Sequence, residues 1–185
     1  MASNAVVQTE LSPQLAAIVR ELDDVSAGFT KLVNELGAGK LWQRPAQGGW
    51  SVGECLDHLT TTTKEIVPKL EALLPTAPKG AEPYKMNWSG RMMAWLMEPP
   101  YRMKFKTTPA FEAKQSDKDV LSEFLASQDL AKEAVRRCNG LALMKINLPS
   151  PASARMHYNA YAALKLAPAH ERRHLWHAQQ IVKMM

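Results

Sequence analysis

The segment SPQLAAIVRELDDVSAGFTKLVNELG, residues 12–37, has the apolar repeat of a long amphipathic helix. Its apolar side chains recur at steps of three and four residues, which places them on one face of a helix. Ser12 can cap the first amides, Pro13 suits the first helical position, and Gly37 can close the last turn. The segment therefore predicts a helix that buries one face in the protein interior.

A second helix is predicted to begin at Ser51. Ser51 and Glu54 match the S-x-x-E capping box, in which each side chain satisfies an amide near the helix start. An apolar face then runs from Val52 to Leu70. Pro68 is expected to kink or shorten the last turns, because proline lacks an amide hydrogen and its ring crowds the preceding turn.

Two further segments have helical spacing. The third helix is predicted to start at Ser116 and to end at Asn139-Gly140. After the loop INLPSPAS, the fourth is predicted from about Ala152 to the C-terminus, with a possible kink at Pro168. No segment shows sustained strand alternation. The pattern predicts an all-α protein whose four long helices form a four-helix bundle.

A proline-rich excursion, from about residue 75 to 115, separates the second and third helices. It is too apolar to be a simple linker, and a short helix is expected over residues 88–97. Its large apolar side chains predict a homodimer, or alternatively a roof over a site within one subunit. These side chains are Trp88, Met92, Met93, Trp95 and Met97. Four basic residues of the excursion could meet an anionic cofactor or form a solvated edge: Arg91, Arg102, Lys104 and Lys106.

Composition favours a single globular domain over residues 1–185, with 46% hydrophobic and 22% charged residues. No apolar run of membrane-spanning length and no secretory signal is present, so we expect a cytoplasmic protein without a membrane partner. The net charge is +5, but the basic residues are mixed with acids and match no nucleic-acid-binding motif. No nucleic-acid partner is therefore expected. Cys55 and Cys138 are predicted to be buried fillers rather than a disulfide.

His170 and His174 are four residues apart in a helical segment, so their side chains share a face and can bind the same cation. The segment HERRH also matches the H-E-x-x-H motif of zinc proteases, in which Glu171 would be the general base. Such proteases find a third ligand downstream, whereas here only His177 follows and no carboxylate does. Glu171 is therefore expected to face solvent or a neighbouring helix.

A third ligand is then expected upstream, from His58 or His157. If the last helix is continuous, His157 lies about 20 Å along the axis from His170, too far to share an ion. His58, near the start of the second helix, can meet the last helix in the core of a bundle, where such folds build metal sites. His58 could also be an ordinary core histidine beside the apolar face.

The segments WSVGECLDHL, residues 50–59, and HERRHLWHAQQI, residues 170–181, resemble the DinB/YfiT-like superfamily. The resemblance also includes WQRP before the second helix. It implies an up-down-down-up bundle whose metal is held by one histidine of the second helix and two of the last. These match His58, His170 and His174. Three neutral imidazoles suit zinc, nickel or ferrous iron and leave positions open for water or substrate.

Three residues near these ligands are candidates for a second shell around the metal. They are His177, where many relatives have glutamine, and Asp57 and Glu171, which adjoin ligands in sequence. His177 could also be a fourth ligand, or simply a core or surface residue.

The resemblance implies a reaction on a small-molecule substrate, because characterised relatives include transferases and isomerases that use low-molecular-weight thiols. A three-histidine metal can hold a thiol as its thiolate or lower the pKa of water to about 7. Thiol-dependent transfer to a small electrophile is the preferred hypothesis. The first alternative is a hydrolase whose general base is Glu54, Asp57 or Glu171. The second is a non-catalytic, metal-stabilised binding module connected with stress.

Overall fold

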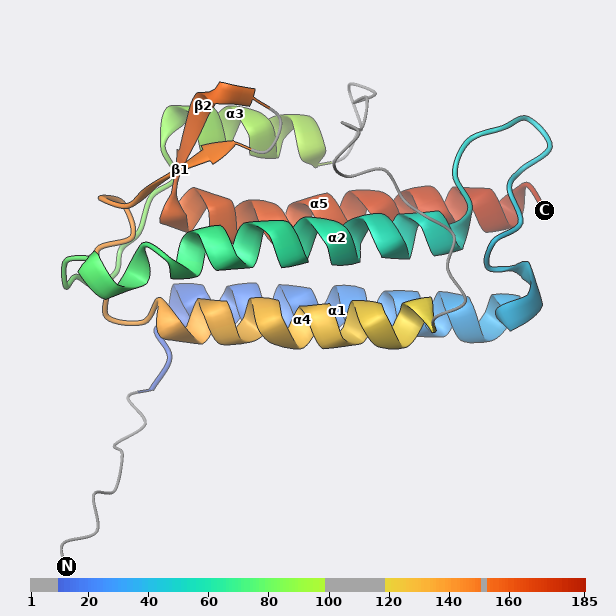
Figure 1. Cartoon of the computed structure of the whole chain (residues 1–185), viewed down its shortest axis with the longest axis horizontal. Helices are drawn as coiled ribbons and strands as arrows, with labels where there is room; N and C mark the ends of the chain where they lie inside the picture. Colours follow the sequence, from blue (N-terminus) through green and yellow to red (C-terminus); the bar gives the residue numbers. More distant parts are fainter. Residues whose placement is uncertain (1–9, 99–118, 151–152) are drawn as a thin grey trace, which may run out of the picture.

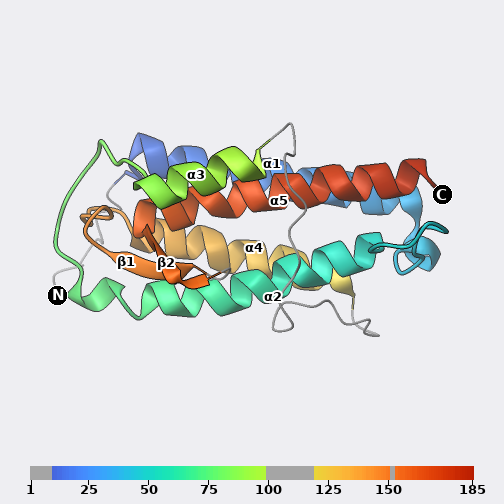
Figure 2. The ribbon, with the colours of Figure 1, turned by 90° about the horizontal axis from the view of Figure 1, so that it is seen from above.

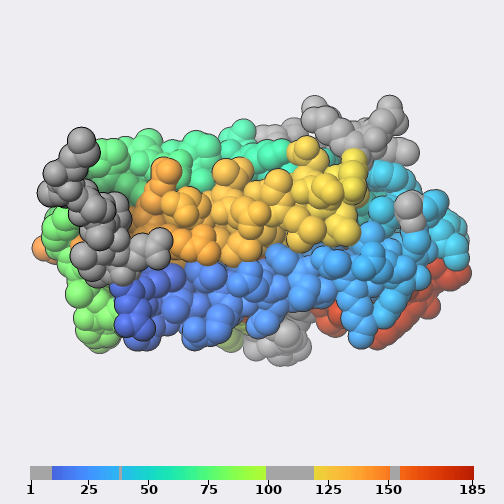
Figure 3. All heavy atoms as spheres, turned by 90° about the horizontal axis from the view of Figure 1, so that it is seen from below, coloured from blue at the N-terminus to red at the C-terminus, as the bar shows by residue number. Residues whose placement is uncertain are grey.

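The structure, a computed structural model, describes residues 10–98, 119–150 and 153–185. It is a four-helix bundle, as predicted (Figure 1). The long helices are α1 (Pro13–Leu36), α2 (Val52–Glu71), α4 (Val120–Arg137) and α5 (Ala160–Lys183). Figure 1 shows α1 and α5 running in one direction and α2 and α4 in the other, which is the up-down-down-up order. Both α1 and α2 pack against α4 and α5, and side chains of α1 and α4 cover the face seen in Figure 3.

The predicted boundaries of α1 hold, but the role of Ser12 differs. The amide of Gly37, at a φ of 78°, donates to the carbonyl of Val33 and closes the helix. Ser12 makes no side-chain cap, so that expectation was wrong. Its backbone amide donates instead to Oδ1 of Asn139 at 3.2 Å, which ties the start of α1 to the turn after α4.

The capping box of α2 is confirmed. The Ser51 hydroxyl accepts from the Glu54 amide at 3.1 Å, and Oε2 of Glu54 accepts from the Ser51 amide at 2.7 Å. Pro68 does not shorten the helix, which continues to Glu71. Proline removes one amide donor, but its own carbonyl still accepts from the amide of Ala72 at 3.0 Å.

The segment before α5 is a β-hairpin, where a loop and the first turns of a helix were predicted. Its strands are β1 (Asn147–Ser150) and β2 (Ser153–Asn159), which pair antiparallel with Leu148 opposite Tyr158. The expected helix start near Ala152 was therefore wrong. In β1 only Leu148 and Ser150 are buried, which is too short an alternation to distinguish from a loop. The α5 helix starts later because Oδ1 of Asn159 caps it, accepting from the Ala162 amide at 2.8 Å.

The described part of the excursion contains the short helix α3 (Trp88–Met97), with the bounds that the sequence predicted. Figure 2 shows α3 lying along α5 beside the hairpin. Two short 3-10 helices, η1 (Ala38–Lys40) and η2 (Leu74–Thr76), complete the described elements. Residues 99–118 lie outside the described ranges, and with them the predicted cap Ser116. The cap of α4 is Asp119, whose Oδ1 accepts from two amides at 3.2 Å.

The interior of the bundle has two main apolar clusters, one near each end. The cluster at the end where α2 begins includes Phe29 and Phe124, both fully buried, with ring centroids 5.2 Å apart. Leu56 and Leu59, which flank His58, belong to this cluster. Among the described helices, none combines the length and hydropathy needed to cross a bilayer.

Candidate metal centre

Three histidines from two helices meet between α2 and α5. His58 lies near the start of α2, and His170 and His174 are one turn apart on α5. The Nε2 atom of His170 is 3.3 Å from that of His58 and 3.1 Å from that of His174. The potential ligand atoms of all three lie within 4.8 Å of one another. The structure thus brings together the three residues that the sequence predicted as ligands.

The antiparallel packing of α2 and α5 produces this convergence. Because α2 starts at the end of the bundle where α5 finishes, an early residue of α2 faces the second half of α5 (Figure 1). Pro168 lies inside α5 without ending it, so the four-residue spacing of His170 and His174 keeps both rings on one face.

Trp50 forms one wall of the cluster. Its ring stacks on His174, with an interplanar angle of 20° and centroids 5.6 Å apart, and meets His58 edge-on at 5.0 Å. Sequence reasoning used Trp50 only as part of a motif and missed this contact. The signal was its place just before the capped start of α2, which anchors the ring near the first turns. A half-buried indole here shields the imidazoles from water.

Burial keeps the imidazoles of His170 and His174 neutral. It lowers the pKa of His170 to about 3, with smaller contributions from His58 and the Arg173 cation. Burial is also the main reason that the pKa of His174 lies well below its ordinary value, and the neighbouring histidines and Arg173 lower it further. Neutral imidazole is the form that binds metals, so no proton has to be displaced from these rings.

The donor set fits a divalent transition metal. Zinc–nitrogen bonds are about 2.0–2.1 Å long, so two nitrogens on one ion lie at most about 4.2 Å apart. Both measured Nε2 separations are inside that limit. No other His, Cys, Asp or Glu of the described residues joins this group, so the set offers three ligands. Three ligands leave room for a water or a substrate, as in catalytic rather than structural zinc sites.

Glu54 is occupied by structural contacts. Its carboxylate pairs with Arg44 through both oxygens and also accepts from the Ser51 amide. Burial raises the pKa of Glu54, but the hydrogen bonds from Arg44 and Ser51 outweigh it and leave the pKa below its ordinary value. A carboxylate with a lowered pKa is a weak base, which argues against Glu54 as the base of a hydrolase.

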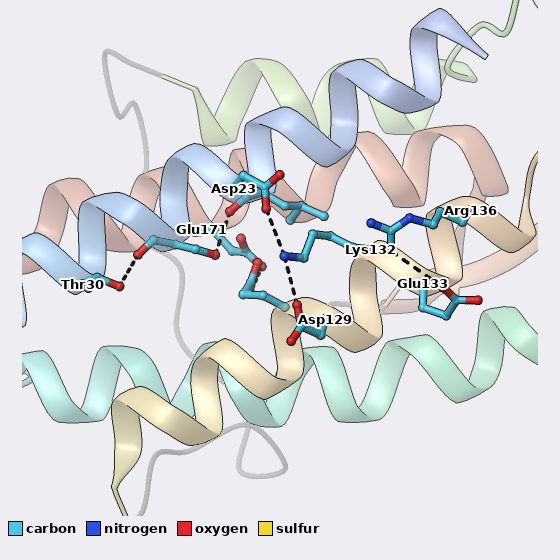
Figure 4. Close-up of polar contacts among 10 residues, drawn as sticks. Asp23, Thr30, Asp129, Lys132, Glu133, Arg136 and Glu171 are labelled. Atoms are coloured by element: carbon cyan, nitrogen blue, oxygen red, sulfur yellow. Dashed lines mark hydrogen bonds and ion pairs between the residues drawn. The ribbon is translucent and has the colours of Figure 1, made fainter. Parts of the chain in front are cut away.

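Glu171 is turned away into the bundle interior. Only 3% of it is exposed, so the alternative of a solvent-facing Glu171 was wrong and that of a neighbouring helix was right. Its Oε1 accepts from Nε2 of Gln128 on α4 at 3.0 Å. Figure 4 shows it between α1 and α4, in the region where Lys132 pairs with Asp23 and Asp129. Burial raises the pKa of Glu171 to about 8, which favours the neutral acid at neutral pH.

The other predicted residues lie in several places. Asp57 is half-buried on α2 beside His58. His157 is on β2 and not on a helix, so the helical argument that excluded it was wrong, although it is outside both described groups of possible metal donors. Arg91 is exposed on α3. Arg102, Lys104 and Lys106 lie outside the described residues.

His177 is one turn beyond His174 and half-buried. Its Nδ1 is 4.0 Å from Sγ of Cys55, which is fully buried on α2. Burial raises the pKa of Cys55 to about 12, with a smaller contribution from the Glu54 charge, so its thiol is protonated at neutral pH. Cys138 is buried too, and both cysteines are free, as predicted.

Comparison with known proteins places this chain in a family. The sequence profile of the DinB superfamily matches residues 21–178, which includes α2, α4 and most of α1 and α5. The chain belongs to the DinB superfamily. All three histidines of the cluster lie within the matched residues.

Among solved structures, the DinB chain is similar to YfiT from Bacillus subtilis, described as a probable metal-dependent hydrolase with an unusual four-helix bundle topology. The TM-score is 0.59 at 17% sequence identity, over 91% of this chain and 86% of YfiT. At that identity the likeness supports the fold alone. No curated protein is a significant match to this sequence.

Proposed function

We propose that His58, His170 and His174 bind one divalent metal ion and that the protein uses it for thiol-dependent transfer to a small electrophile. The observation that carries the proposal is the convergence of the three Nε2 atoms, at 3.3 and 3.1 Å, with burial keeping His170 and His174 neutral. A bound divalent ion would supply Lewis-acid chemistry, lowering the pKa of a thiol or water in its open positions.

The residues around the cluster have separate tasks in this proposal. The three imidazoles hold the ion, and Trp50 excludes water from one side. Glu54 and Glu171 are engaged by Arg44 and Gln128, so neither is poised to take a proton from a bound water. A thiol, with an ordinary pKa of about 8.5, needs less help than water to become a nucleophile. This favours thiol over water as the attacking group.

Hydrolysis is the second candidate, because the structurally similar YfiT is described as a probable metal-dependent hydrolase. It would use the same three histidines, with Asp57 as the nearest remaining carboxylate in sequence. A non-catalytic metal-stabilised module is the third reading. Metal analysis of protein purified without a histidine tag would identify which of zinc, nickel and iron is the native metal.

The metal assignment is tested by replacing each histidine. His58→Ala, His170→Ala and His174→Ala should each bind at least one equivalent of metal less than the wild type, because two imidazoles hold an ion far less tightly than three. His157→Ala is the matched control and should keep the wild-type metal content. Full metal content in His58→Ala would remove α2 from the site and overturn the proposal.

The chemistry is tested with metal-loaded protein, a panel of glutathione, bacillithiol and mycothiol, and a small halogenated or epoxide electrophile. Turnover should require metal and thiol, disappear in His174→Ala, and survive Cys138→Ser. Thiol-independent release of product from esters or amides would establish the hydrolase instead. Stoichiometric metal without either activity, together with a metal-dependent rise in Tm, would support the non-catalytic module.

A further inference from the structure

A second group of possible metal donors lies beside the three-histidine cluster. Cys55, His174 and His177 bring one ligand atom each to within 4.8 Å of one another. Cys55 precedes His58 by three residues on α2, and His177 follows His174 by three residues on α5. Because these helices are antiparallel, three residues back along α2 and three residues forward along α5 lead in the same direction along the bundle. The two groups are therefore successive layers of one helix interface.

We propose that Cys55, His174 and His177 form a second metal site, with one thiolate and two imidazole ligands, that takes soft ions such as Zn²⁺, Cd²⁺ or Cu⁺. Thiolate ligands select such ions, whereas the neighbouring all-nitrogen group does not discriminate in their favour. The site shares His174 with the proposed catalytic centre but does not depend on any activity there.

The separation of the donor atoms suits one ion. Zinc–sulfur bonds of about 2.3 Å and zinc–nitrogen bonds of about 2.1 Å allow Sγ and a ring nitrogen to lie up to about 4.4 Å apart. The Sγ atom of Cys55 and the Nδ1 atom of His177 are 4.0 Å apart. The same spacing fits a shared ion, whereas for a neutral S–H···N hydrogen bond it is a long contact.

The second nitrogen of His174, Nδ1, is the donor atom proposed for this ion. Its Nε2 faces His170 in the first cluster at 3.1 Å. Its Nδ1 is buried and has no hydrogen-bond partner among the described residues. A buried polar atom without a partner costs about 1–3 kcal/mol. An ion between His174 Nδ1, Cys55 and His177 would satisfy that atom.

Binding at this site must release a proton. The thiol of Cys55 loses its proton to solvent as the sulfur–metal bond forms, and with the first cluster empty the two imidazoles bind in their neutral form. When both sites are filled, His174 bridges the two ions as an imidazolate, and its ring proton is released to solvent as well. Cys55 itself is fully buried, whereas His177 is half-buried, so an ion would enter from the His177 side.

The experiment is a titration of the full-length protein with Cd²⁺ or Co²⁺, followed by the near-ultraviolet charge-transfer absorption of a metal thiolate. The wild type should develop the band, and Cys55→Ser and His177→Ala should both lose it. Cys138→Ser is the matched control, because Cys138 is also a free, buried cysteine and should not affect the band. His58→Ala should keep the band, because His58 belongs only to the first cluster.

Circular dichroism of each variant establishes that loss of the band is not loss of the fold. Absence of the band in folded wild-type protein, or its survival in Cys55→Ser, would overturn the second site. Its loss in folded His58→Ala would show one joint site and would also overturn the proposal. Failure of the three-histidine site would give a different result. The thiolate band would persist in the wild type, and His58→Ala would have the same total metal content as the wild type.

Discussion

Replacement of Glu54 by alanine is expected to destabilise the start of α2, one helical turn before His58. The Glu54 carboxylate closes the capping box and also pairs with Arg44 from the preceding loop. Replacement by glutamine separates the two effects. The glutamine amide oxygen can still accept from the Ser51 amide, as in the S-x-x-Q form of the box, but it cannot pair with a cation.

The expected magnitudes follow from the exposure of each partner. Ser51 is fully buried, and its amide donates to Glu54 at 2.7 Å. Loss of a cap together with a buried amide left without an acceptor costs about 1–3 kcal/mol. The Arg44 side chain is 65% exposed, so solvent screens the ion pair and it contributes little to stability. We expect a loss of about 1–3 kcal/mol in Glu54→Ala and a much smaller loss in Glu54→Gln.

The measurement is urea unfolding followed by far-ultraviolet circular dichroism, with the m-value checked to be the same in all proteins. Arg44→Met is the control that removes the ion pair and leaves the capping box, and it should match Glu54→Gln. Equal losses in the alanine and glutamine variants would show that charge, not the cap, stabilises this end. A wild-type-like Glu54→Ala would refute the reasoning altogether.

Three further predictions follow from the same structure. Hydrogen bonds from Arg44 and Ser51 hold the pKa of Glu54 below its ordinary 4.5, so its contribution is present above about pH 4.5 and lost as the pH falls further. The unfolding free energy of wild type relative to Glu54→Gln should shrink in urea titrations below that pH, and a constant difference would contradict this. Gly90→Ala should lose about 1–3 kcal/mol and loosen α3 in hydrogen exchange, because its Cβ would lie 2.4 Å from Ala162 Cβ. Gly39→Ala, with nothing within 4 Å, is the neutral control, and equal stability of the two variants would refute the contact. Trp88 and Trp95, 68% and 58% exposed on α3, predict a homodimer, which a monomeric mass by light scattering at tens of micromolar would exclude.

Much of the candidate site could be predicted because its signals are local. His170 and His174 lie one helical turn apart, and that spacing on one face depends on helix geometry alone. His58 required a further step, since its meeting with α5 depends on how the helices pack. The family resemblance supplied that step, and the Nε2 separations agree with it.

The position of Glu171 could not be predicted in the same way. Its neighbours in sequence, His170 and Arg172, are polar, which is compatible with an exposed position. The deciding contact comes from Gln128, which is 43 residues away on α4. The same holds for the pair of Cys55 and His177, which are 122 residues apart.

The sequence by itself determined the four long helices, the capping box of α2 and the short helix α3, because these depend on periodicity and on hydrogen bonds between residues a few positions apart. Only the tertiary structure decided that residues 147–159 pair as a hairpin and that Trp50 covers the histidine cluster. It also decided that Cys55 meets His177. Such contacts depend on which surfaces the helices bury against one another. That choice depends on apolar area buried over the whole chain, so the local pattern of either segment does not specify its partner.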